Sequence, residues 1–295
     1  MNTPFAIGQH LFAGFAGTEI PADFAALVRQ YQIGNVVLFA HNVQDAPQLR
    51  RLCGELRALV LDATGVIPFI AIDQEGGIVS RLGEDAAVVP SAMAVAATGE
   101  PEDAYQAGLI TGTELRAMGV NFDLAPVLDV NSNPHNPVIG VRSYGQTPEQ
   151  VAHYGIAMMR GLLDGGVLAC GKHFPGHGDT AVDSHVGLPL VDKSLAGLEA
   201  CELAPFRAAI TAGLPAVMSS HILFPQLEPD KLPATMSRRI MTGLLKERLG
   251  FDGLVLSDCM MMGAIADHYG SVAGMVAALK AGVDMVFASH SAQLA

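Results

Sequence analysis

Short apolar runs rich in β-branched residues alternate with longer amphipathic stretches along the whole chain, and this alternation narrows the choice of folds. The runs predict strands, whereas apolar residues at i, i+3 and i+4 in the intervening stretches predict helices. Strands are expected at 6–14, 35–40, 68–73, 122–130, 166–174, 215–222, 253–258 and 284–289. Helices are expected near 21–32, 45–63, 102–118, 147–164, 196–212, 237–249 and 271–281.

Eight strands separated by seven helices are typical of an α/β fold, the (β/α)8 TIM-type barrel. The length of 295 residues suits one such barrel, so we expect a single domain over 1–295. A doubly wound sheet is the alternative, although no GxGxxG motif follows the first predicted strand. No helical pattern follows 284–289, so we expect the final helix of the barrel to be missing or truncated.

Charge and hydropathy exclude several classes of partner. A formal net charge of −12 argues against nucleic acid, whose phosphates bind clusters of Lys and Arg. No apolar run reaches the roughly 20 residues that span a bilayer, and the first residues, MNTPFAIGQH, do not resemble a secretion signal. The cysteines are far apart, as free thiols of a cytoplasmic protein would be, and they are Cys53, Cys170, Cys201 and Cys259.

Polar side chains stand at the predicted carboxyl ends of several strands, where the active sites of (β/α)8 barrels lie. These side chains are Asp73, Asp129, Lys172 with His173, His221, and Asp258. For Lys172 three roles remain open: an ion pair at the barrel mouth, a Schiff-base nucleophile, or a hydrogen-bond donor to substrate hydroxyls. For His221, packing and substrate contact are equally compatible with the sequence.

Residues 171–185, GKHFPGHGDTAVDSH, concentrate titratable side chains in an irregular segment. One interpretation is a metal site, in which His173 and His177 are joined by Asp179, Asp183 and His185. Pro175 and Gly176 separate the first two histidines, however, and would interrupt the helix that usually aligns such ligands.

A second interpretation is a proton-transfer dyad formed by Asp183 and His185. Side chains two residues apart in an extended segment point the same way, so the carboxylate can orient the imidazole for general acid and base catalysis. A capped turn with a solvated histidine is the simpler alternative for this short pattern.

Five motifs together resemble glycoside hydrolase family 3, in particular its bacterial β-N-acetylglucosaminidases of peptidoglycan recycling. They are AIDQEGGIVSRL at 71–82, APVLDV at 125–130, IGVRSYG at 139–145, KHFPGHGDTAVDSH at 172–185 and VLSDCMMMGAI at 255–265. The motifs extend over nearly the whole chain, and the resemblance therefore implies a single catalytic barrel domain, 1–295.

The resemblance also implies a role for individual residues. Asp258 corresponds to the nucleophile, and His185 with its helper Asp183 to the acid/base. The residues that correspond to sugar contacts are Asp73, Arg81, Arg142, Lys172 and His173. No cofactor and no metal are implied.

The implied activity is that of a retaining exo-β-N-acetylglucosaminidase that acts on a small GlcNAc-containing oligosaccharide or muropeptide, as a monomer or weak homo-oligomer. A phosphorylase, another family 3 β-glycosidase, a non-catalytic sugar-binding barrel and a metalloenzyme are the alternatives. Because the acidic chain would repel anionic muropeptides at long range, their binding is expected to rely on local cations such as Arg81, Arg142 and Lys172.

Overall fold

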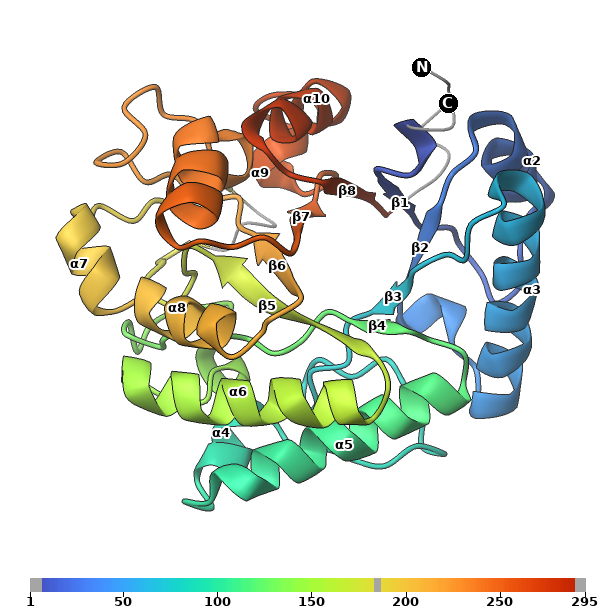
Figure 1. The fold of residues 1–295 in the computed structure, drawn as a ribbon, viewed down its shortest axis with the longest axis horizontal. Coiled ribbons are helices and arrows are strands. Elements are labelled where there is room, and N and C mark those ends of the chain that lie inside the picture. Colours follow the sequence, from blue (N-terminus) through green and yellow to red (C-terminus); the bar gives the residue numbers. More distant parts are fainter. Residues whose placement is uncertain (1–6, 183–186, 290–295) are drawn as a thin grey trace.

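The computed structural model describes residues 7–182 and 187–289, and within them eight parallel strands close into a barrel, as the sequence predicts. Each strand pairs with the next, and the last pairs with the first (Figure 1). The strands are β1 (Leu11–Ala13), β2 (Asn35–Leu38), β3 (Ile70–Ile72), β4 (Phe122–Asp123), β5 (Leu168–Phe174), β6 (Ala216–Ser219), β7 (Leu254–Cys259) and β8 (Met285–Ala288).

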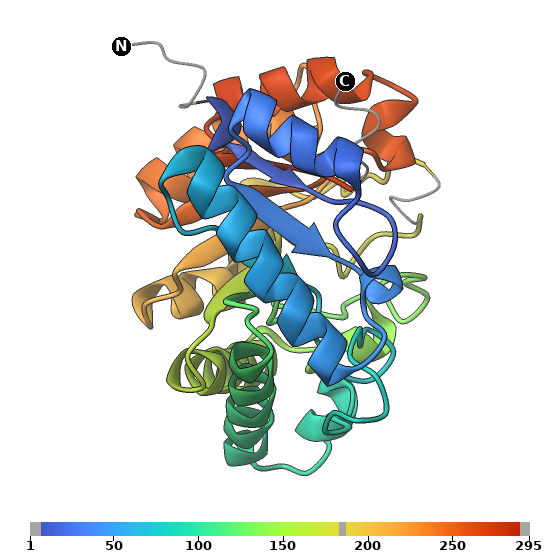
Figure 2. The same ribbon diagram turned by 90° about the vertical axis from the view of Figure 1, so that its right-hand side faces the viewer.

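Helices surround the barrel, and Figure 2 shows α2 and α3 crossing its outer face. The α-helices are α2 (Ala22–Tyr31), α3 (Ala46–Thr64), α4 (Ala92–Ala96), α5 (Pro101–Ala117), α6 (Pro148–Asp164), α7 (Leu195–Ala200), α8 (Leu203–Thr211), α9 (Gly263–Ala266) and α10 (Ser271–Ala281). A helix of π type, η4 (Arg239–Arg248), lies between β6 and β7. Side chains cap two of these helices: Asp45 accepts from Gln48 N at the start of α3, and Thr147 accepts from Gln150 N at the start of α6.

Two separate apolar clusters correspond to the inside and the outside of the barrel wall. The smaller one fills the lumen and includes Phe12, Phe122 and Phe287, whose rings pack together. The larger one lies between strands and helices. Successive strand residues alternate between the two clusters because their side chains point to opposite faces. The lumen is therefore a packed core, and the polar chemistry is confined to the strand ends.

Helices α5 and α6 run side by side along one flank (Figure 1), and glycines bring their backbones into contact. A Cβ atom at Gly161 would collide with the carbonyl oxygen of Tyr105, and one at Gly112 would lie 2.8 Å from the carbonyl oxygen of Leu162. The small residues thus set the distance between the two helices.

We expect Gly161→Ala to lower the free energy of unfolding by about 2 to 4 kcal/mol, because the added methyl group forces the two helix backbones apart. Gly54→Ala, in the middle of α3, is the matched control. No atom lies within 4 Å of its added Cβ, so it should stabilise the protein by roughly 0.5 to 1 kcal/mol. Urea denaturation measures both, and equal effects would contradict the close contact.

The predicted strand 122–130 is wrong beyond its first two residues, since β4 ends at Asp123. Pro126 has no N–H to donate to the ladder, although its carbonyl oxygen still accepts from Lys172 N at 3.1 Å. The segment continues beside β5 through the single bridge Val127–Lys172. The irregular path brings Asp129 close to the end of β5.

The predicted helix 196–212 is interrupted at Cys201 and Glu202, between α7 and α8. The side chain of Glu202 turns inward, is fully buried, and binds Lys193 Nζ at 2.5 Å. A buried ion pair of this kind has no periodic signature. The short helices α4 and α9 are likewise absent from the sequence-based expectation.

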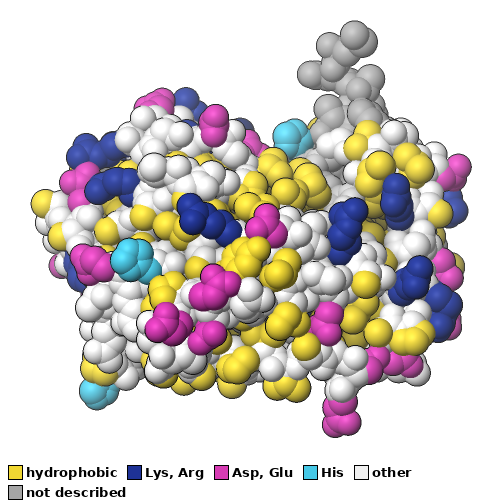
Figure 3. Space-filling model, turned by 60° about the horizontal axis from the view of Figure 1, so that its bottom comes forward, with side chains coloured by type: hydrophobic (Ala, Val, Ile, Leu, Met, Phe, Trp, Pro, Cys, Tyr) yellow, Lys and Arg dark blue, Asp and Glu magenta, His cyan; other side chains and the backbone are white. Residues whose placement is uncertain are grey.

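Within the described residues no helix is both long and apolar enough to cross a membrane, and the four cysteines are free thiols. On the face in Figure 3, acidic, basic and hydrophobic side chains are interspersed, and no continuous basic patch is seen there. The expectation about a final helix concerns residues after Ser289, which lie outside the described part of the chain.

Candidate active site

A cavity of about 250 Å³ opens at the carboxyl ends of the strands. The predicted substrate-binding residues and the predicted nucleophile all line it, namely Asp73, Arg81, Arg142, Lys172, His173 and Asp258. They come from four different strand ends and the loops that follow them. The parallel barrel therefore gathers side chains that are far apart in the sequence.

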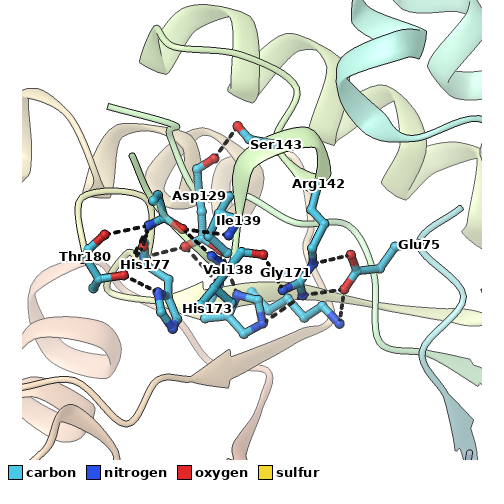
Figure 4. A network of polar contacts seen from close by, with 12 residues as sticks. Glu75, Asp129, Val138, Ile139, Arg142, Ser143, Gly171, His173, His177 and Thr180 are labelled. Atoms are coloured by element: carbon cyan, nitrogen blue, oxygen red, sulfur yellow. Dashed lines mark hydrogen bonds and ion pairs between the residues drawn. The ribbon is translucent and has the colours of Figure 1, made fainter. Parts of the chain in front are cut away.

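A buried network of ion pairs forms one wall of the cavity. Lys172 Nζ lies 2.6 Å from Asp73 Oδ1 and 2.6 Å from Glu75 Oε1. Arg142 binds Glu75 with two hydrogen bonds, from Nε to Oε2 at 2.8 Å and from Nη2 to Oε1 at 2.7 Å. Figure 4 shows Arg142 and Glu75 facing each other, and Glu75 thus holds two cations at once.

The charges of this network stabilise one another. Burial alone would raise the pKa of Glu75, but Lys172 and Arg142 outweigh it and lower that pKa to about 2. Burial alone would lower the pKa of Lys172, but Asp73 and Glu75 raise it above its ordinary value. A lysine that stays protonated cannot attack a carbonyl group. Of the three roles that the sequence left open, the structure therefore shows the ion pair of Lys172 and disfavours the Schiff base, whereas donation to substrate hydroxyls stays a prediction.

His173 is held in place by Asp129 (Figure 4). Asp129 Oδ2 lies 2.7 Å from His173 Nδ1, and the carboxylate also accepts from the backbone N–H groups of His173 and His177. Burial would raise the pKa of Asp129, but His173 outweighs it and lowers that pKa. The carboxylate therefore fixes the ring orientation of His173, and the other ring nitrogen faces Arg142 Nη2 at 3.5 Å.

His177 shapes the loop that follows β5. Its Nδ1 lies 2.8 Å from Thr180 Oγ1, and Asn136 donates to its carbonyl oxygen at 2.8 Å. The rings of His173 and His177 meet edge to face with centroids 5.7 Å apart. No three His, Cys, Asp or Glu side chains of residues 7–182 and 187–289 are placed to hold a metal ion.

Acid should destabilise the protein through His177. Burial and the neighbouring His173 lower the pKa of His177 from 6.5 to about 4, so the unfolded chain binds an extra proton between these values. We expect the free energy of unfolding to fall by roughly 3 kcal/mol as the pH drops from 6.5 to 4. Urea titrations at several pH values measure this slope. His177→Gln should reduce it, whereas replacement of the exposed His153 by Gln should not.

Asp258, at the end of β7, faces the same cavity as Asp73 and Lys172. Its Oδ1 accepts from Cys259 N at 2.7 Å. Burial would raise the pKa of Asp258, but His221, His173 and Lys172 outweigh it and lower that pKa. The two histidines contribute more to this lowering than Lys172 does.

His221 is buried and is not among the residues that line the cavity. Its Nε2 lies 3.0 Å from the carbonyl oxygen of Cys259, and its Nδ1 lies 2.9 Å from Thr235 Oγ1. Because a carbonyl oxygen only accepts, Nε2 carries a proton. Of the two roles that the sequence left open, the structure supports packing against the backbone that carries Asp258.

The hairpin after β3 positions Arg81. Gly76 and Gly77 have φ values of +91° and +56°, which favour glycine and allow a tight turn here. Gln74 Oε1 accepts from Arg81 N at 2.7 Å, and Arg81 Nη2 lies 3.9 Å from Asp73 Oδ2. The guanidinium group is half-buried beside the cavity.

The predicted acid/base residues, Asp183 and His185, lie outside the described residues, so their roles stay predictions. Two residues that received no role from the sequence are central to the site. Glu75 lies within the motif DQEGG, and Asp129 stands at a predicted strand end. The sequence shows a carboxylate at each of these positions. The side chains that pair with it follow other strands, so the motif alone does not reveal its role.

A family model described as "Glycosyl hydrolase family 3 N terminal domain" matches residues 7–294. "Beta-hexosaminidase A" of Pseudoalteromonas piscicida is 40% identical over 92% of this chain and 48% of its own length. "Beta-hexosaminidase" of Thiobacillus denitrificans is 38% identical over 97% of this chain and 79% of its own length.

Solved structures agree with the sequence comparisons. A family 3 β-N-acetylglucosaminidase from Paenibacillus is 47% identical, with a TM-score of 0.96 over 98% of this chain and 55% of that chain. NagZ from Neisseria gonorrhoeae, in complex with N-trifluoroacetyl-D-glucosamine, is 34% identical, with a TM-score of 0.84 over 95% of this chain and 80% of that chain. The chain thus spans about half the length of the first relative in each comparison.

Proposed function

Because the chain belongs to glycosyl hydrolase family 3, we propose that it is a retaining exo-β-N-acetylglucosaminidase. The observation that carries the proposal is the convergence of Asp258 with Asp73 and Lys172 on one cavity. A carboxylate that is held ionised beside hydrogen-bond donors and acceptors suits attack on the anomeric carbon of a bound sugar. Relatives named as a β-hexosaminidase and a β-N-acetylglucosaminidase point in the same direction.

In the first step Asp258 attacks C1 of the terminal GlcNAc residue and forms a covalent glycosyl ester. The bond from C1 to the leaving oxygen breaks, and His185 gives this oxygen its proton. Asp183 holds the imidazole of His185 and stabilises its protonated form.

In the second step His185 removes a proton from water, which attacks C1 and releases Asp258. Two inversions give overall retention of configuration. The sugar hydroxyls are held by Asp73, Arg81, Arg142, Lys172 and His173, whose orientation Glu75 and Asp129 maintain.

The Lys and Arg side chains of the cavity are already paired, and this favours water over phosphate as the acceptor of the glycosyl group. Among the described residues that line the cavity, each Lys or Arg already faces a carboxylate. Phosphate would need such a cation unpaired. We therefore propose hydrolysis of small GlcNAc-terminated oligosaccharides, with fragments of peptidoglycan as one source of them.

Product analysis tests the proposal. The purified protein is incubated with an activated GlcNAc β-glycoside, with and without phosphate, and with the matched glucose and xylose glycosides. We expect free GlcNAc in both buffers, with β configuration in the initial product, and slow cleavage of the other two sugars. GlcNAc-1-phosphate would indicate a phosphorylase, and binding without turnover a non-catalytic barrel.

A further inference from the structure

His221 is a buried titratable side chain to which the proposed mechanism gives no role. It follows β6, and β6 pairs in parallel with β7, whose end carries Asp258 (Figure 1). His221 is only 1% exposed, so a charge on its ring would be screened little by solvent. The protonation state of this ring therefore bears on the chemistry of the proposed nucleophile.

Both ring nitrogens of His221 face oxygen atoms. Nε2 lies 3.0 Å from the carbonyl oxygen of Cys259, which can only accept a hydrogen bond, so Nε2 carries a proton. Nδ1 lies 2.9 Å from Oγ1 of Thr235, which belongs to the short 3-10 helix η3 (Ala234–Met236). The charge of the ring then depends on which of these two atoms is the donor.

The hydroxyl of Thr235 has one proton, and its other partners indicate where that proton goes. Thr235 Oγ1 donates to the carbonyl oxygen of Ser220 at 2.8 Å. The two lone pairs of Oγ1 are then left to accept, one from Ser219 Oγ at 2.9 Å and one from His221 Nδ1. In this fully satisfied arrangement His221 donates from both nitrogens and is positively charged.

Asp258 is the counter-charge. Burial raises the pKa of Asp258, and His221 has the largest of the effects that lower it, ahead of His173 and Lys172. Among the described residues, the titratable groups that act on Asp258 are therefore Lys172 and His173 from the end of β5, His221 from beyond β6, and the neighbouring thiol of Cys259 on β7. The partners of His221 in β6 and η3 contribute only hydroxyl groups.

We propose that His221 is an imidazolium with both ring protons, and that it is a positioning residue which keeps Asp258 ionised and stabilises this carboxylate as it leaves C1. The inference rests on the proposed function, in which Asp258 forms and releases a glycosyl ester. In the second step the bond from C1 to the ester oxygen breaks, and its electron pair returns to Asp258 as negative charge. A fixed cation nearby favours this step over the first, in which the same negative charge is consumed.

NMR of the protein with isotope-labelled histidine rings tests the protonation state directly. We expect both ring nitrogens of His221 to carry a proton at neutral pH, with the signals assigned by their loss in His221→Gln. Thr235→Val removes the oxygen that Nδ1 faces and should abolish the second proton, whereas Thr235→Ser keeps the hydroxyl and should retain it. One protonated and one bare nitrogen in the wild-type protein would overturn the inference.

Kinetics with a dinitrophenyl GlcNAc β-glycoside test the effect on Asp258, because this leaving group needs no proton. The amide of His221→Gln can still donate to the carbonyl oxygen of Cys259 but carries no charge. We expect the acid limb of its kcat/KM profile to move up by about one pH unit, since Asp258 loses a nearby positive charge. At neutral pH the burst of phenolate, which reports ester formation, should stay within about twofold, and the steady rate of ester breakdown should fall roughly 10-fold.

His10→Gln is the matched control. Nδ1 of His10 also faces a carbonyl oxygen, that of Asp284 at 2.6 Å, but His10 precedes β1 at the opposite end of the barrel, so its replacement should change neither measurement. An unshifted acid limb in His221→Gln, or equal slowing of both steps, would overturn the inference and leave the hydrolase intact. No turnover by the wild-type protein would overturn the proposed function, while NMR would still show whether His221 carries both protons.

Discussion

Asp258→Asn is expected to lower turnover of GlcNAc β-glycosides by a factor of roughly 10⁴ to 10⁶, the range found when a catalytic nucleophile is removed. The amide cannot form the glycosyl ester, so the first chemical step is lost. The side-chain oxygen of asparagine still accepts from Cys259 N, which Asp258 Oδ1 now does at 2.7 Å. The fold and the affinity for GlcNAc should therefore be maintained, as thermal melting and calorimetry would measure.

Asp267→Asn makes the same chemical change at an exposed position in the following loop and should leave turnover within twofold of wild type. A second variant, Asp258→Gly, opens space for azide, which should restore turnover and yield the α-glycosyl azide. Wild-type turnover in Asp258→Asn would refute the assignment of the nucleophile.

His185→Ala is expected to slow cleavage of GlcNAc disaccharides by roughly 10² to 10⁴, because their leaving oxygen needs a proton. The dinitrophenolate group of an activated glycoside leaves without protonation. The rate of glycosyl ester formation from this substrate should therefore change less than about 10-fold. Stopped-flow release of the phenolate measures that step alone.

Asp183→Asn serves as the comparison, since it keeps the imidazole of His185 and removes only the carboxylate that is proposed to hold it. Its rate of disaccharide cleavage should lie between those of wild type and His185→Ala. In its pH–rate profile, the limb that depends on protonation of the catalytic acid should be shifted. Equal losses on both substrates in His185→Ala would show that this histidine supports the structure and does not transfer the proton.

The barrel could be predicted from sequence because each strand and helix carries its own local periodicity. The errors occur where tertiary contacts override that periodicity. Pro126 ends the regular pairing of β4, and the inward turn of Glu202 to Lys193 divides the helix predicted at 196–212. Neither event is encoded in the spacing of apolar residues.

The site could be predicted in outline for the same reason, since parallel strands in a barrel bring their carboxyl ends together. The convergence of Asp73, Lys172 and Asp258 follows from that rule. The rule does not say which charges neutralise which. The role of Glu75 emerges only when Lys172 and Arg142 are seen on either side of it.

The sharing of Glu75 between Lys172 and Arg142 has a consequence for protein engineering. Substitution of Glu75 leaves Arg142 without its carboxylate, and substitution of either cation removes one of the two partners of Glu75. The effects of mutations at the three positions are therefore strongly non-additive. Libraries that randomise one position at a time will score each of them as intolerant. New sugar specificities at this wall will be reached only by libraries that vary the three codons jointly.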